Sequence, residues 1–436
     1  MMCGFAGLAN LDGAPADASV VAAMTHLVAH RGPDDRGEHT FSLRGRGVDC
    51  AVGFHRLKIL DLSDRGHQPM ASPSSDVILA LNGEIYNAFD YQAELDAAGV
   101  SLRSRSDAEI VLHLYERYGL EGFLDRLNGM LAMMIADLRR HQIHLVRDHF
   151  GIKPLSWTRV GASILFASEA RAFLAHPGFT AAIAERHLDE QLAFRYVAGG
   201  ASLLKGVHLL RPGHRLRITP DGVTTTRYAS IPDATDAGLT PEAAVRATQF
   251  QPDAKLARLR PGANLAAAIE RRLDIFSEGG GDHLSNWLNY EMQTFLVDVL
   301  MRQDKMLMAH GTENRVPFLD RRIVAFARTL KASHLIGDAG KAIVKALARQ
   351  VFPPAFVDRA KGAFNLPLSQ YFRGRRFGEL MEEAWLPGMK RRGLVSETAV
   401  RALWRRSLSA PALTEVLWIP VALEVWAQQF VDGRRA

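Results

Sequence analysis

Cysteine is scarce in this chain: Cys3 and Cys50 are the only two among 436 residues. Two thiols cannot build a disulfide framework, and no C-x-x-C pair or Cys/His cluster indicates a zinc site. The sequence therefore predicts a reducing, cytoplasmic location and no metal site.

Long apolar runs are also missing. The longest one, residues 413–431, is interrupted by Glu415, Pro420 and Glu424, whereas a membrane-spanning helix needs about 20 mostly apolar residues. The N-terminus has no basic stretch leading into an apolar core, which a signal peptide would have. We expect neither a membrane span nor a signal peptide, and no membrane partner.

Neither sign of charge dominates. The 53 Lys and Arg residues exceed the 47 Asp and Glu residues by six, and they form no long basic run, so no nucleic-acid partner is predicted. With 47% hydrophobic and 23% charged residues, the composition is typical of soluble globular proteins. At about 150 residues per domain the length allows two or three domains, and we expect two.

Several widespread catalytic motifs do not occur. The chain has no G-x-S-x-G, no H-E-x-x-H and no G-x-x-x-x-G-K-[ST] sequence, which removes the simplest evidence for a serine hydrolase, a zinc protease or a phosphate-loop enzyme.

The sequence pattern predicts different secondary structure in the two halves of the chain. Apolar runs typical of strands fill the first half, at residues 5–11, 76–81, 130–138, 143–147 and 164–167. The second half favours helices at 287–308, 322–330, 341–352, 377–385 and 399–404. Residues 229–258 show little periodicity and mark the boundary between them.

Two polar groups sit at element ends. The run at 76–81 ends in Asn82-Gly83-Glu84, so we expect a buried strand to deliver these residues to a turn. Ser106 and Glu109 have the spacing of a capping box, which places Asp107 in the first turn of a helix that Gly119 ends.

Cys3 is the strongest single feature, because a cysteine at the N-terminus can use its own α-amine as general base. An α-amine has a pKa of about 7.7 to 8.0, so much of it is free to accept a proton near neutrality. On position alone, a small buried structural thiol is an equally good interpretation.

An ordered series of motifs favours the catalytic interpretation of Cys3 over the structural one. In order and spacing they resemble the glutaminase domain of the glutamine-dependent asparagine synthetase family, over about residues 3–228. The motifs are Cys3-Gly4-Phe5-Ala6-Gly7, His30-Arg31-Gly32-Pro33-Asp34, His55-Arg56-Leu57-Lys58-Ile59-Leu60-Asp61, Asn82-Gly83-Glu84-Ile85-Tyr86-Asn87, Ser106-Asp107 and Arg147-Asp148-His149-Phe150-Gly151-Ile152-Lys153-Pro154-Leu155.

The resemblance implies an α+β fold. Its first part would be an N-terminal-nucleophile hydrolase, a four-layer α-β-β-α sandwich, at residues 3–228. A linker or truncated region would follow at 229–276. Residues 277–436 would form a mostly helical remnant of an α/β ATP-pyrophosphatase-type synthetase domain.

The resemblance also implies roles at the glutaminase site. Cys3 would attack the side-chain amide of glutamine, giving a thioester and ammonia, and Asn82 with Gly83 would form the oxyanion hole. Arg56 would hold the substrate α-carboxylate, and Glu84 and Asp107 the α-ammonium. Leu57 and Ile59 would complete the glutamine-binding site.

Each of these assignments has a simpler alternative. Asn82-Gly83 is also a strong hairpin-turn signal. Arg56 could form a surface salt bridge, and Asp107 could interact with the helix dipole at a capped N-terminus.

The start of the chain departs from the family. It reads Met1-Met2-Cys3, whereas the family needs cysteine as the first residue after processing. Initiator removal normally requires a small second residue, so the α-amine of Cys3 would be freed by a start at Met2 or by a separate cleavage.

The second half resembles the synthetase domain of the same family, at 288–296, 302–304, 306–310, 313–320 and 359–367. That domain activates aspartate with ATP and Mg²⁺ and cradles pyrophosphate in a Ser-Gly-Gly-x-Asp-Ser loop. No such loop occurs here, and the 48 residues between Tyr228 and Ser277 have room for only one βαβ unit of about 30 residues. The core of the ATP domain therefore looks deleted.

Remnants of an ATP site are nevertheless present in the sequence. Ser277, Gly280 and Asp282 lie in a stretch that resembles the second nucleotide motif, and Lys361 matches a lysine near the phosphates. Their alternatives are a flexible glycine turn and a solvated charge. We predict no cofactor for the glutaminase half, and ATP with Mg²⁺ only where the synthetase half is active.

The leading hypothesis is an asparagine synthetase-family amidotransferase that releases ammonia from glutamine. Its other expected partners are aspartate, or a related carboxylate, with ATP, a chain that supplies the missing ATP site, and a second copy in a homodimer. The alternatives are a non-catalytic remnant with a binding or regulatory role, and a mildly basic surface-binding protein.

Overall fold

The computed structural model describes residues 3–43, 47–229, 240–278, 283–330, 332–335, 341–359 and 367–433. Contacts divide the chain into two compact units. Unit 1 contains Met1–Ala181, Gly199–Ile231 and Glu291–Val324, and unit 2 contains Ala182–Ala198, Pro232–Tyr290 and Ala325–Ala436.

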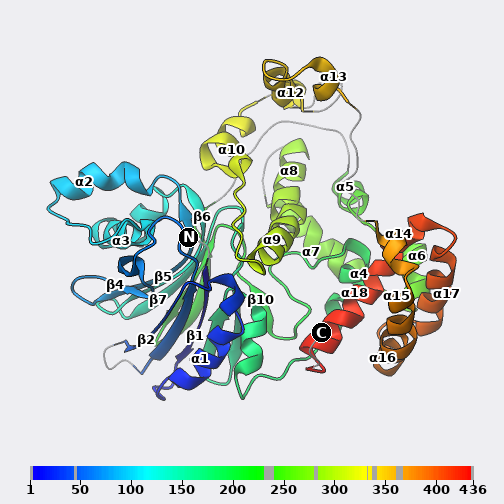
Figure 1. Cartoon of the computed structure of the whole chain (residues 1–436), viewed down its shortest axis with the longest axis horizontal. Coiled ribbons are helices and arrows are strands. Elements are labelled where there is room, and N and C mark those ends of the chain that lie inside the picture. Colours follow the sequence, from blue (N-terminus) through cyan, green and yellow to red (C-terminus); the bar gives the residue numbers. More distant parts are fainter. Residues whose placement is uncertain are drawn as a thin grey trace. The chain divides into compact units, whose positions relative to one another are not determined.

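Two six-stranded antiparallel sheets form the centre of unit 1 (Figure 1). The first has the strand order β10 (Val207–Leu209), β8 (Ser156–Val160), β9 (Ser163–Ala167), β1 (Cys3–Asn10), β3 (Asp49–Arg56) and β2 (Asp35–Ser42). The second has the order β12 (Gly222–Arg227), β11 (His214–Thr219), β7 (Gln142–Arg147), β6 (Gly129–Asp137), β5 (Val77–Ile85) and β4 (Met70–Ala71).

Helices cover the outer faces of these sheets. Helix α1 (Ala18–His26) packs on β1 and β3, β1 faces β5 of the other sheet, and α3 (Asp107–Leu124) packs on β5 (Figure 1). This order is α-β-β-α, so the expected four-layer sandwich is confirmed. Its core is continuous between the sheets because β1 and β5 are buried along their whole length.

A segment from the second half of the chain belongs to unit 1. Helix α9 (Phe295–Met308) and the residues after it form an apolar cluster with Met130, Phe150 and Ile152, to which they contribute Leu300 and Met308. Asp320 accepts a hydrogen bond from Asn128 Nδ2 at 2.9 Å. Apolar burial and this hydrogen bond together hold residues 291–324 on the sheets.

In the described residues of unit 2, all regular secondary structure is helical. It contains α4 (Leu188–Phe194), α5 (Pro241–Ala247), α6 (Asp253–Leu259), α7 (Ala266–Ser277), α8 (His283–Gln293, whose last three residues fall in unit 1), the second half of α10 (Arg321–Arg328), α11 (Ala332–Leu335), α12 (Ala342–Ala348), α13 (Pro354–Val357), α14 (Leu368–Phe372), α15 (Arg375–Leu380), α16 (Leu386–Arg392), α17 (Glu397–Ser407) and α18 (Thr414–Phe430).

One buried ion pair ties α4 into this unit. Arg272 on α7 donates from Nε to Glu190 at 2.9 Å and from Nη1 to the Tyr290 hydroxyl at 2.8 Å. Both charged side chains are fully buried, so Arg272 needs Glu190 for charge compensation, while Glu190 also pairs with Arg271.

Three local expectations are corrected. Asn82-Gly83-Glu84 does not form a turn, because β5 continues to Ile85, paired with Gly129 on β6. Residues 287–308 form two helices, α8 and α9, separated at Thr294 by non-helical backbone. Residues 229–258 include α5 and α6, although their periodicity is weak.

The capping box predicted at Ser106 and Glu109 is present in part at the start of α3. The Ser106 side chain caps it by accepting the Ala108 N–H at 3.3 Å. The Glu109 carboxylate accepts the N–H groups of Arg103 and Ser104, two residues that precede the helix.

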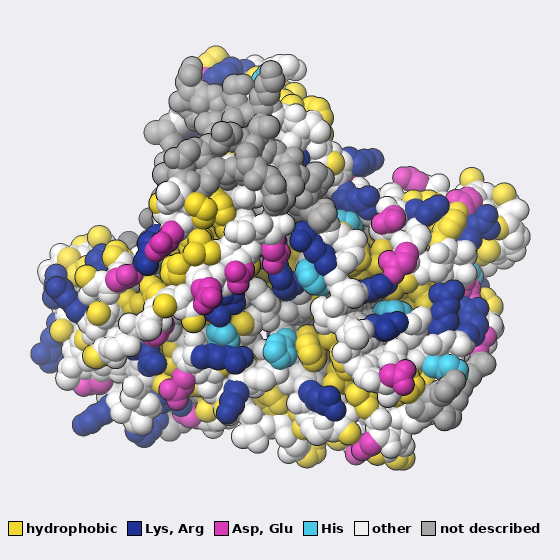
Figure 2. Space-filling view, turned by 180° about the vertical axis from the view of Figure 1, so that it is seen from behind, with side chains coloured by type: hydrophobic (Ala, Val, Ile, Leu, Met, Phe, Trp, Pro, Cys, Tyr) yellow, Lys and Arg dark blue, Asp and Glu magenta, His cyan; other side chains and the backbone are white. Residues whose placement is uncertain are grey.

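Charged side chains of both signs are mixed on the surface. On the face drawn in Figure 2, Lys and Arg side chains lie among acidic and apolar ones. Among the helices of the described ranges, none is long and apolar enough to cross a membrane.

Candidate active site

Cys3 begins β1 and lies opposite Arg56 on β3. Its side chain is completely buried. Burial raises the pKa of the Cys3 thiol to about 11, and the Leu57 backbone N–H, which hydrogen-bonds to it, lowers that pKa by a smaller amount. At neutral pH the thiol is therefore protonated and needs a base before it can act as a nucleophile.

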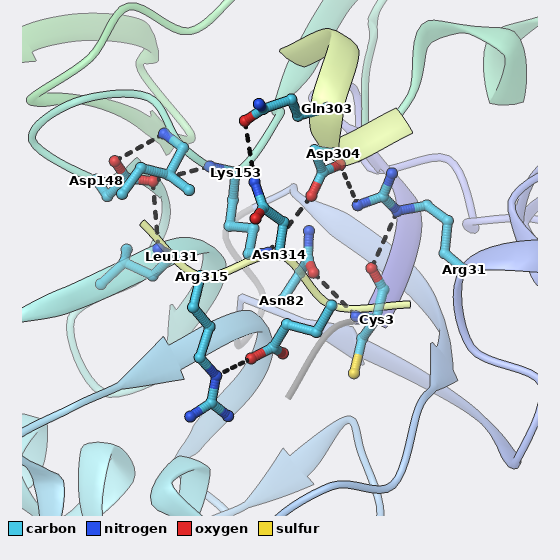
Figure 3. Close-up of polar contacts among 12 residues, drawn as sticks. Cys3, Arg31, Asn82, Leu131, Asp148, Lys153, Gln303, Asp304, Asn314 and Arg315 are labelled. Carbon is cyan, nitrogen blue, oxygen red and sulfur yellow. Dashed lines mark hydrogen bonds and ion pairs between the residues drawn. The ribbon is translucent and has the colours of Figure 1, made fainter. Parts of the chain in front are cut away.

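Asn82 reaches Cys3 from the second sheet. Its Oδ1 accepts a hydrogen bond from the Cys3 backbone nitrogen at 2.9 Å (Figure 3). Its Nδ2 is buried and has no hydrogen-bond partner within the described part of the chain. A buried donor without a partner costs free energy, so this amide is positioned to donate to a group that is not among the described residues.

Gly83 follows Asn82 and lies tightly against β6. A Cβ at this position would collide with the Met130 carbonyl oxygen and come within 2.7 Å of Leu131 Cα. Its φ of +156° also favours glycine. The close strand pairing fixes the backbone beside Asn82.

Arg56 is fully buried, which excludes the surface salt bridge. Its Nη1 donates to the Ser63 carbonyl at 2.9 Å and its Nη2 to the Asp61 carbonyl at 2.5 Å. These bonds fasten the loop after β3. Leu57 and Ile59, which are half-buried, lie in the same loop.

Asp107 is buried at the start of α3. It accepts the Ile85 N–H at 2.9 Å and the Ala108 N–H at 3.0 Å, so it joins the end of β5 to the helix. Burial raises the pKa of its carboxyl. A helix-capping role is thus present in the structure, beside any role in binding substrate.

Glu84 has a partner from a distant part of the sequence. Its carboxylate forms an ion pair with the Arg315 guanidinium (Figure 3). The Nε of Arg315 also donates to Glu313 at 2.6 Å. Burial, with a smaller contribution from Glu313, raises the pKa of Glu84 to about 7.

Arg31 was in a quoted motif but received no role from the sequence. It is completely buried and donates from Nε to the Cys3 carbonyl at 3.1 Å. One terminal nitrogen donates to Asp304 at 2.7 Å (Figure 3). The other donates to Glu169 at 2.8 Å. Arg31 therefore positions the backbone of the candidate nucleophile.

A buried loop after β7 supports this network. The Asp148 carboxylate accepts the N–H groups of Leu131, Phe150, Ile152 and Lys153. Lys153 in turn lies 3.4 Å from Asp304 through its Nζ. Motif matching indicated that 147–155 mattered, but it could not show that Asp148 organises the loop.

The candidate ATP residues do not come together as a described site. Gly280, Asp282 and Lys361 lie outside the described residues. Ser277 is exposed at the last position of α7, which is the negative end of the helix dipole and the wrong end for phosphate. Its placement does not fit a nucleotide, and we derive no step through ATP or Mg²⁺.

Across the residues that the structure describes, no group of three or more His, Cys, Asp or Glu side chains is arranged to hold a metal ion.

Two family profiles match this sequence. The one described as "Glutamine amidotransferase domain" covers residues 2–229, and the one described as "Asparagine synthase" covers residues 178–428. Each covers more than half of the chain.

Two curated relatives each match about half of the chain. The chain is 34% identical over 246 residues to asparagine synthetase [glutamine-hydrolyzing] 2 of Bacillus subtilis (strain 168), which is 53% of this chain and 31% of that protein. It is 35% identical over 214 residues to asparagine synthetase [glutamine-hydrolyzing] 3 of the same organism, 48% of this chain and 33% of that one. The match thus spans about a third of the length of these relatives.

Among solved structures, one of glutamine phosphoribosylpyrophosphate amidotransferase from B. subtilis is similar with a TM-score of 0.39 and 21% identity. The match covers 56% of this chain and 52% of that one.

Proposed function

Because the chain belongs to the asparagine synthase family and carries its glutamine amidotransferase domain, we propose that it hydrolyses glutamine to glutamate and ammonia at Cys3. The observation that carries this proposal is the Asn82 amide. Its oxygen holds the Cys3 nitrogen, while its buried nitrogen has no partner in the described residues.

The first step is attack on the substrate amide. Once processing exposes Cys3, its α-amine takes the proton from the thiol, and the sulfur attacks the side-chain carbonyl carbon of glutamine. The carbonyl oxygen becomes an oxyanion, for which Asn82 Nδ2 and the Gly83 N–H are the proposed donors. Asn82 Oδ1, at 2.9 Å, orients the amine.

The second step releases the products. The protonated amine gives its proton to the leaving nitrogen, so ammonia departs and a thioester remains. The same amine then deprotonates a water molecule, which hydrolyses the thioester to glutamate and regenerates the thiol.

Substrate recognition is assigned to charged residues around Cys3. Arg56 is proposed to bind the α-carboxylate, and Glu84 with Asp107 the α-ammonium. Leu57 and Ile59 are proposed to line the same site.

The fate of ammonia is a separate proposal. ATP-dependent amidation of aspartate, or a related carboxylate, would require a competent ATP site, in the second half or on a partner chain. Further proposals are a homodimer, a cytoplasmic location, and domains at residues 3–228 and 277–436 joined by 229–276.

The test is a product analysis. Protein whose N-terminus is Cys3 by intact mass is incubated with glutamine, aspartate and Mg-ATP, and glutamate, asparagine and AMP are quantified. We expect glutamate, lost in Cys3→Ala and retained in Cys50→Ala, since Cys50 is a second completely buried thiol in the same sheet.

Each result has a defined meaning. Asparagine with AMP would show that the shortened chain completes the synthetase reaction. No glutamate from protein with an exposed Cys3 would overturn the proposed function and leave a non-catalytic binding role.

A further inference from the structure

Glu84 is occupied in the free protein. The Arg315 guanidinium pairs with its carboxylate (Figure 3). Glu84 is the group to which the proposed function assigns the substrate α-ammonium. A substrate cation and Arg315 would therefore compete for the same carboxylate.

The charge of this cluster favours an exchange of cations. Glu84 and Glu313 both form ion pairs with the one Arg315 guanidinium. An α-ammonium on Glu84 would bring a second cation to these two carboxylates. Arg315 would keep a partner after leaving Glu84, because its Nε already lies 2.6 Å from Glu313.

The side chain of Arg315 is able to move while its backbone is held. Its side chain is 50% exposed, against 8% for Glu84. The chain just after it is anchored, since Val316 and Leu319 pack on the apolar cluster and Asp320 bonds to Asn128. Rotation of one long, half-exposed side chain is thus enough to open the carboxylate.

We propose that Arg315 gates the α-ammonium subsite: it neutralises Glu84 in the free protein, and the α-ammonium of glutamine displaces it toward Glu313. This inference rests on the proposed function, since it uses Glu84 as the ammonium ligand. The closed pair lowers apparent affinity because only the open fraction binds substrate. It also selects for ligands that carry a cation able to replace the guanidinium.

The gate is tested by binding, which does not need turnover. On a Cys3→Ala background, calorimetry gives the Kd of glutamine with and without Arg315→Ala. We expect Arg315→Ala to tighten binding roughly 3- to 10-fold, because a competitor is removed. The matched control is Arg302→Ala, whose side chain is also 50% exposed, belongs to the same segment and pairs with Asp298. It should leave the Kd within twofold.

A second ligand separates gating from a general structural effect. Glutaric acid monoamide is glutamine without the α-amino group, so it cannot replace Arg315 on Glu84. Arg315→Ala should not tighten binding of this ligand. Equal tightening of both ligands, or an unchanged or weaker Kd for glutamine, would overturn the gate.

In the active protein the same variant should lower KM for glutamine and leave kcat within twofold. If the protein with Cys3 exposed makes no glutamate, the proposed reaction is wrong while the calorimetry still decides the gate. If glutamine is hydrolysed and Arg315→Ala raises KM, the gate is wrong and the reaction stands.

Discussion

At the scale of single residues, the Asn82 amide has two different sides. Its oxygen accepts from the Cys3 nitrogen, and its nitrogen is buried without a partner in the described residues. The carboxamide therefore links the proposed base to the proposed oxyanion site, so that one side chain serves both halves of the reaction.

Asn82→Asp tests this division of labour. The variant keeps an oxygen for the Cys3 amine and replaces the Nδ2 donor by a second acceptor. Loss of one oxyanion donor typically costs about 100- to 1000-fold in kcat, and we expect a loss of that size in steady-state glutaminase assays. Thermal unfolding monitors folding, and a kcat within threefold of the parent would contradict the assignment.

Glu84 predicts a pH dependence of substrate binding. Its pKa is raised to about 7 by burial and by Glu313, so it is ionised above that pH and neutral below it. Only the ionised form attracts an α-ammonium, and KM for glutamine should rise as pH falls from 8 to 6. The Glu84→Gln variant should bind glutamine more weakly, and its KM should not depend on pH. A parent KM that does not change with pH would contradict the role of Glu84 in binding.

At the scale of elements, the contact between β5 and β6 fixes the backbone of the site. Gly83 leaves no room for a side chain beside Met130 and Leu131. The same glycine made the motif resemble a turn, and only the pairing along β5 shows that it serves a close strand contact.

Gly83→Ala should destabilise the protein beyond the effect of a positive φ alone. The matched control is Gly99→Ala, where φ is +77° and nothing lies within 4 Å of the added Cβ. Forcing a methyl group into a packed core costs about 1–3 kcal/mol, and we expect the difference between the variants in denaturant unfolding to have this size. Equal stability of the two would contradict the close contact.

The sequence predicted the sandwich and the grouping of Cys3 with Asn82, because each depends on a short motif or a short apolar run. It could not predict that Arg31 bonds to Asp304, 273 residues later, or that Arg315 pairs with Glu84. The partner of a charged side chain depends on the tertiary structure, and the spacing of residues along the sequence does not predict it.

At the scale of the molecule, the two compact units do not follow the order of the chain. Residues 291–324, which match the synthetase part of the family, pack in unit 1 with the sheets. Helix α4 comes before β10, β11 and β12 of unit 1 in the sequence, but it packs in unit 2. The boundaries at 228 and 276 remain a prediction from motif order.

A chain that ends at residue 229 should fold poorly. It would expose Met130, Phe150 and Ile152, each at most 5% exposed in the whole chain, and would remove the Asp304 partner of Arg31. We expect a lower melting temperature and binding of a hydrophobic dye. The full-length Asp304→Asn variant separates the charge effect from the apolar one, and a fragment as stable as the whole chain would contradict the assignment.

The pairing of Arg31 with Asp304 has a consequence for synthesis on the ribosome. Strand β12 ends at Arg227 and the segment that completes unit 1 ends at Val324, so 324 − 227 = 97 residues separate them. At 5–20 residues per second this is a delay of roughly 5–20 s. During that interval Arg31 has Glu169 as a carboxylate partner but lacks Asp304, which makes this stretch of translation the point at which a chaperone would act.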